Sequence, residues 1–162
     1  MYVANLLGGL VFAALSAVPA IAEGGERMSL GLPQGVAAEF QNRAGDRVFF
    51  AESSAELGAR ALAAIDAQAA WLLQHPSLAI TIEGHADDWG STRENLELAE
   101  RRAAAVRKSL IVRGVAAERI ATISFGRTRR AADCAEPMCR AQNRRSITVL
   151  IPAPGAATSA GR

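Results

Sequence analysis

A short apolar run followed by a long amphipathic helix leaves few folds open to this chain. Residues 78–83 (LAITIE) are rich in β-branched side chains and lie between a proline and a glycine, which predicts a buried strand. Ser91 and Glu94 then form a capping-box pattern, and the predicted helix continues to about Arg113 and stops at Gly114. Its apolar stripe consists of Leu96, Ala99, Ala103, Val106 and Leu110. A helix with one apolar face must bury that face against another helix or a sheet.

A second helix is predicted before this strand. Ser53 and Glu56 also have capping-box spacing, so a helix is expected to begin at Ser53 and to end before Pro76. Apolar residues again recur every three to four positions, at Leu57, Ala61, Ile65, Ala69 and Leu72. Trp71 on this helix is expected in the core.

Three further β-like runs complete the expected sheet, at residues 47–51, 119–125 and 146–151. The resulting order is β-α-β-α-β-β. It predicts an α+β domain with a mixed sheet and two helices packed on one face, because right-handed crossovers place both helices on the same side.

The two ends of the chain differ in composition from the middle. Residues 1–22 carry no charge and end in Ala-Ile-Ala, which is typical of a cleaved signal peptide; an uncleaved membrane anchor is the alternative. Residues 23–43 contain Gly, Pro and polar residues without a sustained period and predict a linker. Residues 44–152 are the expected domain, and residues 153–162 a disordered tail. Either reading of the N-terminus predicts a periplasmic protein.

The only two cysteines, Cys134 and Cys139, lie five residues apart. In an oxidising compartment such a pair is expected to close a disulfide. A metal site is the alternative, but no histidine lies near the pair. The HADD segment, with His85, Asp87 and Asp88, is likewise a weak metal signal, so no metal or cofactor is expected.

The overall charge of the chain does not indicate a nucleic acid as a partner. The chain has 18 basic and 16 acidic residues, a net charge of +2, which is too balanced to indicate a polyanion partner. The most basic stretch contains Arg127, Arg129, Arg130, Arg140, Arg144 and Arg145. No aromatic residue interleaves with these arginines, so nucleic-acid binding is not expected.

Three polar residues are expected to converge near the start of the long helix that begins at the Ser91 capping box. Asp87 lies in a glycine-flanked turn after the buried strand, and Asn95 and Arg102, seven residues apart, share a helix face about 10 Å apart along its axis. Arg102 lies at the edge of the apolar stripe, so its guanidinium is expected to stay accessible. From spacing alone, Asp87 and Arg102 could equally form a structural ion pair.

The segment GHADDWGSTRENLELAERRAAAV, residues 84–106, resembles the OmpA-like peptidoglycan-binding domain. The similarity extends from VFFAESSAEL at 48–57 to Asn143-Arg144-Arg145. It implies non-covalent binding of peptidoglycan and no enzymatic activity, with Asp87 and Arg102 as the two principal binding residues.

The same resemblance implies a ligand, the diaminopimelate of a stem peptide. Asp87 would accept from its ammonium group, and Arg102 would form a bidentate pair with its carboxylate. Backbone N–H groups around Ser53 would assist, and Asn95 and Arg144 would support the pocket. The family often has an aromatic residue and an aspartate where this chain has Glu52 and Ser53, which puts the affinity in question.

Two other functional classes stay open. A wall-acting hydrolase is disfavoured because the adjacent Asp87 and Asp88 are poorly placed for acid and base catalysis across one bond. A scaffold for other envelope proteins is compatible with wall binding, and membrane association is expected only if residues 1–22 remain attached. Trp89, in the binding turn, is expected to offer an exposed stacking surface.

Overall fold

A computed structural model describes residues 32–134 and 136–152 of the 162-residue chain. The predicted signal peptide, the first part of the predicted linker and the predicted C-terminal tail lie outside the described residues. Among the described helices, none is long and apolar enough to cross a membrane.

The sheet has four strands, and its mixed character is confirmed. The strands are β1 (Arg47–Phe49), β2 (Leu78–His85), β3 (Ile120–Gly126) and β4 (Arg145–Pro152). Their spatial order is β1-β4-β2-β3, with β2 parallel to β3 and β4 antiparallel to both β1 and β2. The two central strands, β4 and β2, therefore lead toward opposite ends of the sheet.

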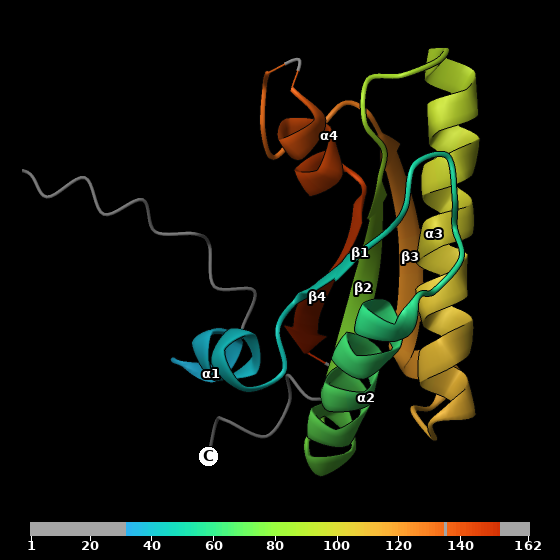
Figure 1. Ribbon diagram of the computed structural model, residues 1–162. Coiled ribbons are helices and arrows are strands. Elements are labelled where there is room, and N and C mark those ends of the chain that lie inside the picture. The colour runs from blue at the N-terminus through green and yellow to red at the C-terminus, as the bar shows by residue number, and fades with distance from the viewer. Residues whose placement is uncertain (1–31, 135, 153–162) are drawn as a thin grey trace, which may run out of the picture.

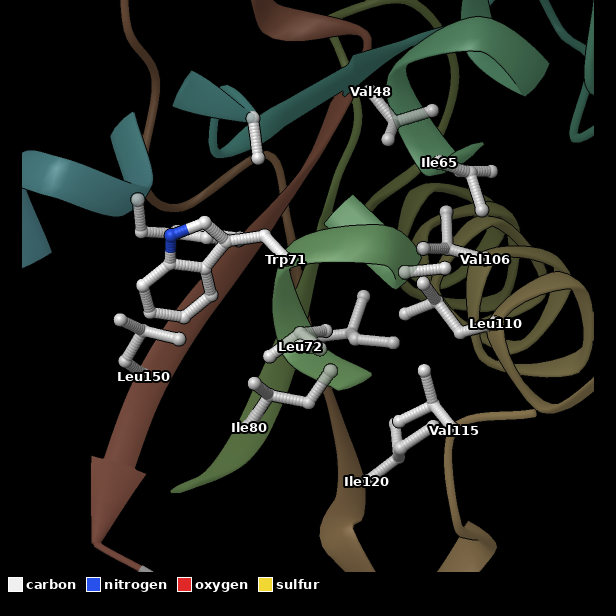
Figure 2. Packing of buried hydrophobic residues seen from close by; sticks show 14 of the residues in the cluster. Val48, Ile65, Trp71, Leu72, Ile80, Val106, Leu110, Val115, Ile120 and Leu150 are labelled. Carbon is white, nitrogen blue, oxygen red and sulfur yellow. The ribbon is translucent and has the colours of Figure 1, made fainter. Parts of the chain in front are cut away.

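Helices α2 (Ala59–Gln74) and α3 (Thr92–Val112) pack together on one face of the sheet, as predicted (Figure 1). Figure 2 shows Ile65 and Leu72 of α2 meeting Val106 and Leu110 of α3 over Ile80 of β2. Four of the five residues predicted for the α3 stripe are buried. Leu96 is 41% exposed, because it lies in the first turns of the helix toward the edge strand β3.

The contact between α3 and β2 is close. Gly84, near the end of β2, lies against the backbone carbonyl of Ala99, and a Cβ atom at position 84 would clash with this carbonyl. A glycine is therefore required here for packing and not for its backbone angles. This close approach brings the end of β2, and the turn that follows it, against the first half of α3.

The expected irregular linker is wrong for its last eight residues. These form helix α1 (Val36–Arg43), whose Phe40 is 1% exposed and lies 4.9 Å, centroid to centroid, from the Trp71 ring. Trp71 is itself buried, as predicted. The sequence pattern was too short to indicate a helix by itself, and the burial of Phe40 against α2 supplies what the local sequence lacks.

The two predicted capping boxes had different outcomes. In the second, the Ser91 hydroxyl accepts from the Glu94 backbone N–H at 3.2 Å and the Glu94 carboxylate accepts from the Ser91 N–H at 2.8 Å, which confirms the start of α3. The first is not formed. Helix α2 begins at Ala59, after Gly58, and residues 51–58 form a loop.

Two short helices complete the described chain, the 3-10 helix η1 (Ala117–Arg119) and α4 (Pro137–Asn143). The sequence predicts a long loop between β3 and β4, whereas the structure has helix α4 within it. Figure 1 shows α4 at the same end of the sheet as the turn that follows β2. The residues predicted to bind ligand gather at this end.

Candidate functional site

Asp87 lies in the turn after β2, as predicted, but its carboxylate is largely covered. The residue is 5% exposed. Its Oδ1 accepts from the Trp89 backbone N–H at 3.4 Å, and its Oδ2 lies 3.3 Å from Nη1 of Arg144. The carboxylate therefore already has one backbone donor and one cation.

Arg144 is the cation that pairs with Asp87. It stands between α4 and β4, and its Nε donates to the Phe50 carbonyl at 3.3 Å while the Phe50 N–H donates to the Arg144 carbonyl at 2.9 Å. Its side chain is 15% exposed. The remaining guanidinium N–H groups have no hydrogen-bond partner among the described residues, so Arg144 can still receive an anion.

Arg102 does not have the accessible guanidinium that was predicted. It is 0% exposed, and its guanidinium donates to three backbone carbonyls, those of Ser54 (2.8 Å), His85 (2.9 Å) and Ala51 (3.1 Å). The alternative of a structural ion pair with Asp87 is also wrong, because among the described residues Asp87 pairs with Arg144. Arg102 joins α3, the end of β2 and the 51–54 loop.

The electrostatics of Arg102 follow from this burial. Burial lowers the pKa of the guanidinium to about 10, the Asp87 carboxylate raises it, and Arg144 lowers it further. Arg102 therefore stays protonated at neutral pH. Its positive charge acts on Asp87 through space, together with that of Arg144.

The loop around Ser53 differs from the prediction. Ser53 has φ 51°, in the left-handed region, and the Ser54 hydroxyl, not that of Ser53, accepts from the Glu56 N–H at 2.9 Å. Arg102 donates to two carbonyls of this loop, and residues 51–58 are not helical. The backbone N–H groups around Ser53 therefore do not form a helix N-terminus.

Asn95 shares a helix face with Arg102, as predicted, but this face is buried. Asn95 is 2% exposed, and its Nδ2 has no hydrogen-bond partner among the described residues. A buried amide donor without a partner is costly in free energy, by about 1–3 kcal/mol. The Asn95 amide, at the start of α3 and eight residues after Asp87, therefore has capacity for one further acceptor.

A second charged group surrounds Asp88. Its carboxylate lies 3.6 Å from Nε of Arg140 and 3.9 Å from Nη1 of Arg130. The Arg140 guanidinium also lies over the Trp89 ring, 5.3 Å from its centroid. Trp89 is 64% exposed, which confirms its predicted exposure.

The two cysteines lie in the chain segment between Arg130 and Arg140. The predicted Cys134–Cys139 disulfide is present, with Cα atoms 5.8 Å apart, and it ties the first turn of α4 to the preceding loop. Glu136 is close to both sulfur atoms, but the sulfurs are bonded to each other, so this cluster is not arranged to bind a metal.

Asn143, at the end of α4, anchors the same loop. Its Oδ1 accepts from the N–H groups of Ala131 (2.7 Å) and Ala132 (3.1 Å), and its Nδ2 donates to the Ala132 carbonyl at 2.9 Å. The disulfide and Asn143 thus hold α4 at both ends. Arg140 and Arg144, which contact Asp88 and Asp87, are positioned by this helix.

The structure brings together four of the five predicted site residues, but the Arg102 guanidinium is buried and the cation paired with Asp87 is Arg144. Asp87, Arg102 and Arg144 share one charged environment, and Asn95 lies on the same face of α3 as Arg102. Ser53 belongs to the loop that Arg102 holds. The contact of Asp88 with Arg140 was not predicted, although Pro137 at the first helical position is a signal for α4 that the sequence contains.

Known proteins are similar to this chain in sequence and in fold. Residues 49–144 match the OmpA family. A peptidoglycan-associated lipoprotein of Rhizobium meliloti is 46% identical over 126 residues, which cover 75% of this chain and 72% of that protein.

Solved structures agree with the sequence comparison. The crystal structure of the peptidoglycan-associated lipoprotein from Burkholderia pseudomallei superposes with a TM-score of 0.63 and 31% identity, over 65% of this chain and 89% of that one. The C-terminal domain of Helicobacter pylori MotB gives a TM-score of 0.61 and 26% identity, over 65% and 83% of the two chains. The chain belongs to the OmpA family.

Proposed function

We propose that this protein binds peptidoglycan non-covalently, through the diaminopimelate of a stem peptide, and is thereby anchored in the cell envelope on the periplasmic side. Membership of the OmpA family and the similarity to peptidoglycan-associated lipoproteins support peptidoglycan binding and anchoring in the cell envelope. The pair formed by Asp87 and Arg144 supports diaminopimelate as the ligand, because it places an anion and a cation 3.3 Å apart in a largely covered position at the end of the sheet.

Asp87 is the acceptor for the ligand ammonium group. An ionised carboxylate has about four lone-pair sites, and two of those of Asp87 are taken by Trp89 N–H and Arg144. The carboxylate therefore retains capacity for an ammonium donor. Such a charge-assisted hydrogen bond is about twice as strong as a neutral one.

Arg144 is the donor for the ligand carboxylate, a role that the sequence pattern assigned to Arg102. Arg144 is partly exposed and has guanidinium N–H groups to spare, whereas Arg102 is fully buried and already serves three carbonyls. Arg102 is accordingly a positioning residue. It holds the 51–54 loop beside the site and adds positive charge close to Asp87.

Two further groups complete the proposed pocket. Asn95 is 2% exposed, so like Arg102 it supports the pocket from within α3 and does not touch the ligand, and backbone N–H groups of the loop around Ser53 are proposed to donate at the rim. A zwitterionic amino acid needs both an acceptor and several donors, and this set provides both.

Retention on purified peptidoglycan sacculi tests the proposal. We expect Asp87→Asn and Arg144→Gln each to weaken retention more than tenfold, because truncating one partner of a desolvated charged contact costs about 2–5 kcal/mol. Asp133→Asn is the matched control: it removes the same charge from an exposed position on the neighbouring loop and should retain wild-type binding.

Three outcomes would contradict the proposal. Retention unchanged by Asp87→Asn would exclude Asp87 from the site. Release of soluble muropeptides by the wild-type protein would indicate a hydrolase. Loss of retention in Asp133→Asn as well would indicate non-specific charge binding to the wall.

A further inference from the structure

The exposed ring of Trp89 is tied to the carboxylate of the proposed ligand site. Trp89 follows Asp87 by two residues in the same turn, and its backbone N–H donates to Asp87 Oδ1 at 3.4 Å. Two residues span at most about 7 Å of chain. The Cα atoms of Asp87 and Trp89 therefore lie within about 7 Å of each other, and the indole ring of Trp89 is 64% exposed.

Charged residues fix how this ring is presented. The Arg140 guanidinium covers the ring at 5.3 Å from its centroid, and the Asp88 carboxylate holds Arg140 in place at 3.6 Å. Arg130 contacts the other oxygen of Asp88 and also pairs with Asp133 at 2.9 Å. An aromatic ring has two faces, so with Arg140 over one of them the high exposure of Trp89 leaves ring surface open to a ligand.

An exposed tryptophan beside charged side chains is suited to a sugar ring. One side of a pyranose ring presents C–H groups, which pack against the electron-rich face of an indole, while its edge presents hydroxyl groups. Arg140 and Asp88 provide a donor and an acceptor beside the indole for such polar groups.

We infer that Trp89, Asp88 and Arg140 form a second subsite, which binds an amino-sugar ring of the glycan strand next to the stem peptide. This inference rests on the proposed function of Asp87 and Arg144. In peptidoglycan two amino acids lie between the sugar and the diaminopimelate, so three residue steps, roughly 10 Å of extended chain, separate the two groups. A stem peptide that is not fully extended can therefore place both groups against neighbouring subsites on one turn.

Calorimetric titration with two soluble probes tests this subsite. One probe is the free tripeptide that ends in diaminopimelate, and the other is the same tripeptide attached to its disaccharide. We expect the wild-type protein to bind the disaccharide form about fivefold more tightly. In Trp89→Ala this preference should vanish while the affinity for the free tripeptide stays unchanged, because the substitution keeps the backbone N–H that donates to Asp87.

Matched variants separate the ring from its surroundings. Trp89→Phe keeps an aromatic face and should retain part of the preference. Met138→Ala removes another exposed apolar side chain, 75% exposed on α4, and should retain all of it. Thermal unfolding of Trp89→Ala is expected to match the wild type, since the ring is mostly outside the core.

The two proposals fail in different ways. Equal binding of both probes by the wild-type protein, or equal weakening of both by Trp89→Ala, would overturn the sugar subsite and leave the stem-peptide site standing. Tripeptide binding that survives Asp87→Asn would instead overturn the stem-peptide site. Failure of the wild-type protein to bind either probe would overturn both.

Discussion

Arg102 reaches from helix α3 to the end of strand β2, where its Nη1 donates a hydrogen bond to the carbonyl of His85 at 2.9 Å. The same guanidinium holds the carbonyls of Ala51 and Ser54, which precede α2. One buried side chain therefore connects three segments that are far apart in the sequence. This contact makes Arg102 a structural requirement of the site.

Replacement of Arg102 is expected to destabilise the whole domain. Arg102→Ala leaves three carbonyls without their donor and removes a fully buried side chain, which should lower the free energy of unfolding by about 3–5 kcal/mol. Urea denaturation measures this loss. Arg101→Ala, at an exposed neighbouring position, is the control and should change stability by less than about 0.5 kcal/mol. A loss below about 1 kcal/mol for Arg102→Ala would show that the carbonyls find other donors.

A methyl group at position 84 is expected to disrupt the packing of α3 on β2. Gly84→Ala places a Cβ atom against the Ala99 backbone carbonyl, so the helix must move away from the strand, at a cost of about 1–3 kcal/mol or more. Thermal unfolding measures the effect. Gly58→Ala, where nothing lies within 4 Å and φ is −71°, should cost about 1 kcal/mol or less. Equal losses in the two variants would argue against the close contact.

Stability is expected to fall between pH 6.5 and pH 4 because of His85. This ring is 1% exposed and stacks on Phe125, and burial lowers its pKa to about 4, with Arg145 and Arg129 acting in the same direction. The unfolded chain, with a histidine pKa of about 6.5, binds a proton in this range that the folded chain does not bind. Protonation therefore favours unfolding as the pH drops, by up to about 3 kcal/mol.

The pH effect is measured as the free energy of unfolding of the wild type and of His85→Gln. The difference between the two proteins isolates His85 from carboxylates that titrate in the same range. His85→Gln should show a shallower dependence between pH 6.5 and pH 4. Parallel curves would mean that the His85 ring takes up its proton over the same pH range in the folded and the unfolded chain.

Reduction of the Cys134–Cys139 disulfide is expected to loosen α4 without unfolding the sheet. Closing so short a loop stabilises by about 2 kcal/mol in the chain-entropy model. Under reductant the unfolding midpoint should fall, while a variant with both cysteines replaced by serine should not respond. Hydrogen exchange should rise mainly around residues 127–144, because Asn143 still anchors the loop from the other side. A uniform rise across β2 and α3 would contradict a local role.

Much of the fold followed from local patterns in the sequence. The apolar run at residues 78–83 and the Ser91 capping box predicted β2 and α3, and both formed as expected because their signals lie within a few residues of one another. The order of the main elements and the disulfide followed in the same way. Asp87 could be placed after β2 because a glycine and a strand end precede it.

The tertiary structure decided between local patterns of equal quality. Ser53 and Glu56 have the same spacing as Ser91 and Glu94, yet only the second pair caps a helix. The first pair lies in a loop with Ser53 at φ 51°, and Arg102, 48 positions beyond Ser54, donates to the Ala51 and Ser54 carbonyls of that loop. Likewise, spacing placed Asn95 and Arg102 on one face of α3 but could not show that this face is buried, nor that Arg144 would be the cation beside Asp87. Sequence alone thus determined the elements and the residue types of the site. The partner of each charge depends on long-range hydrogen bonds and burial, which exist only once the sheet and the helices have assembled.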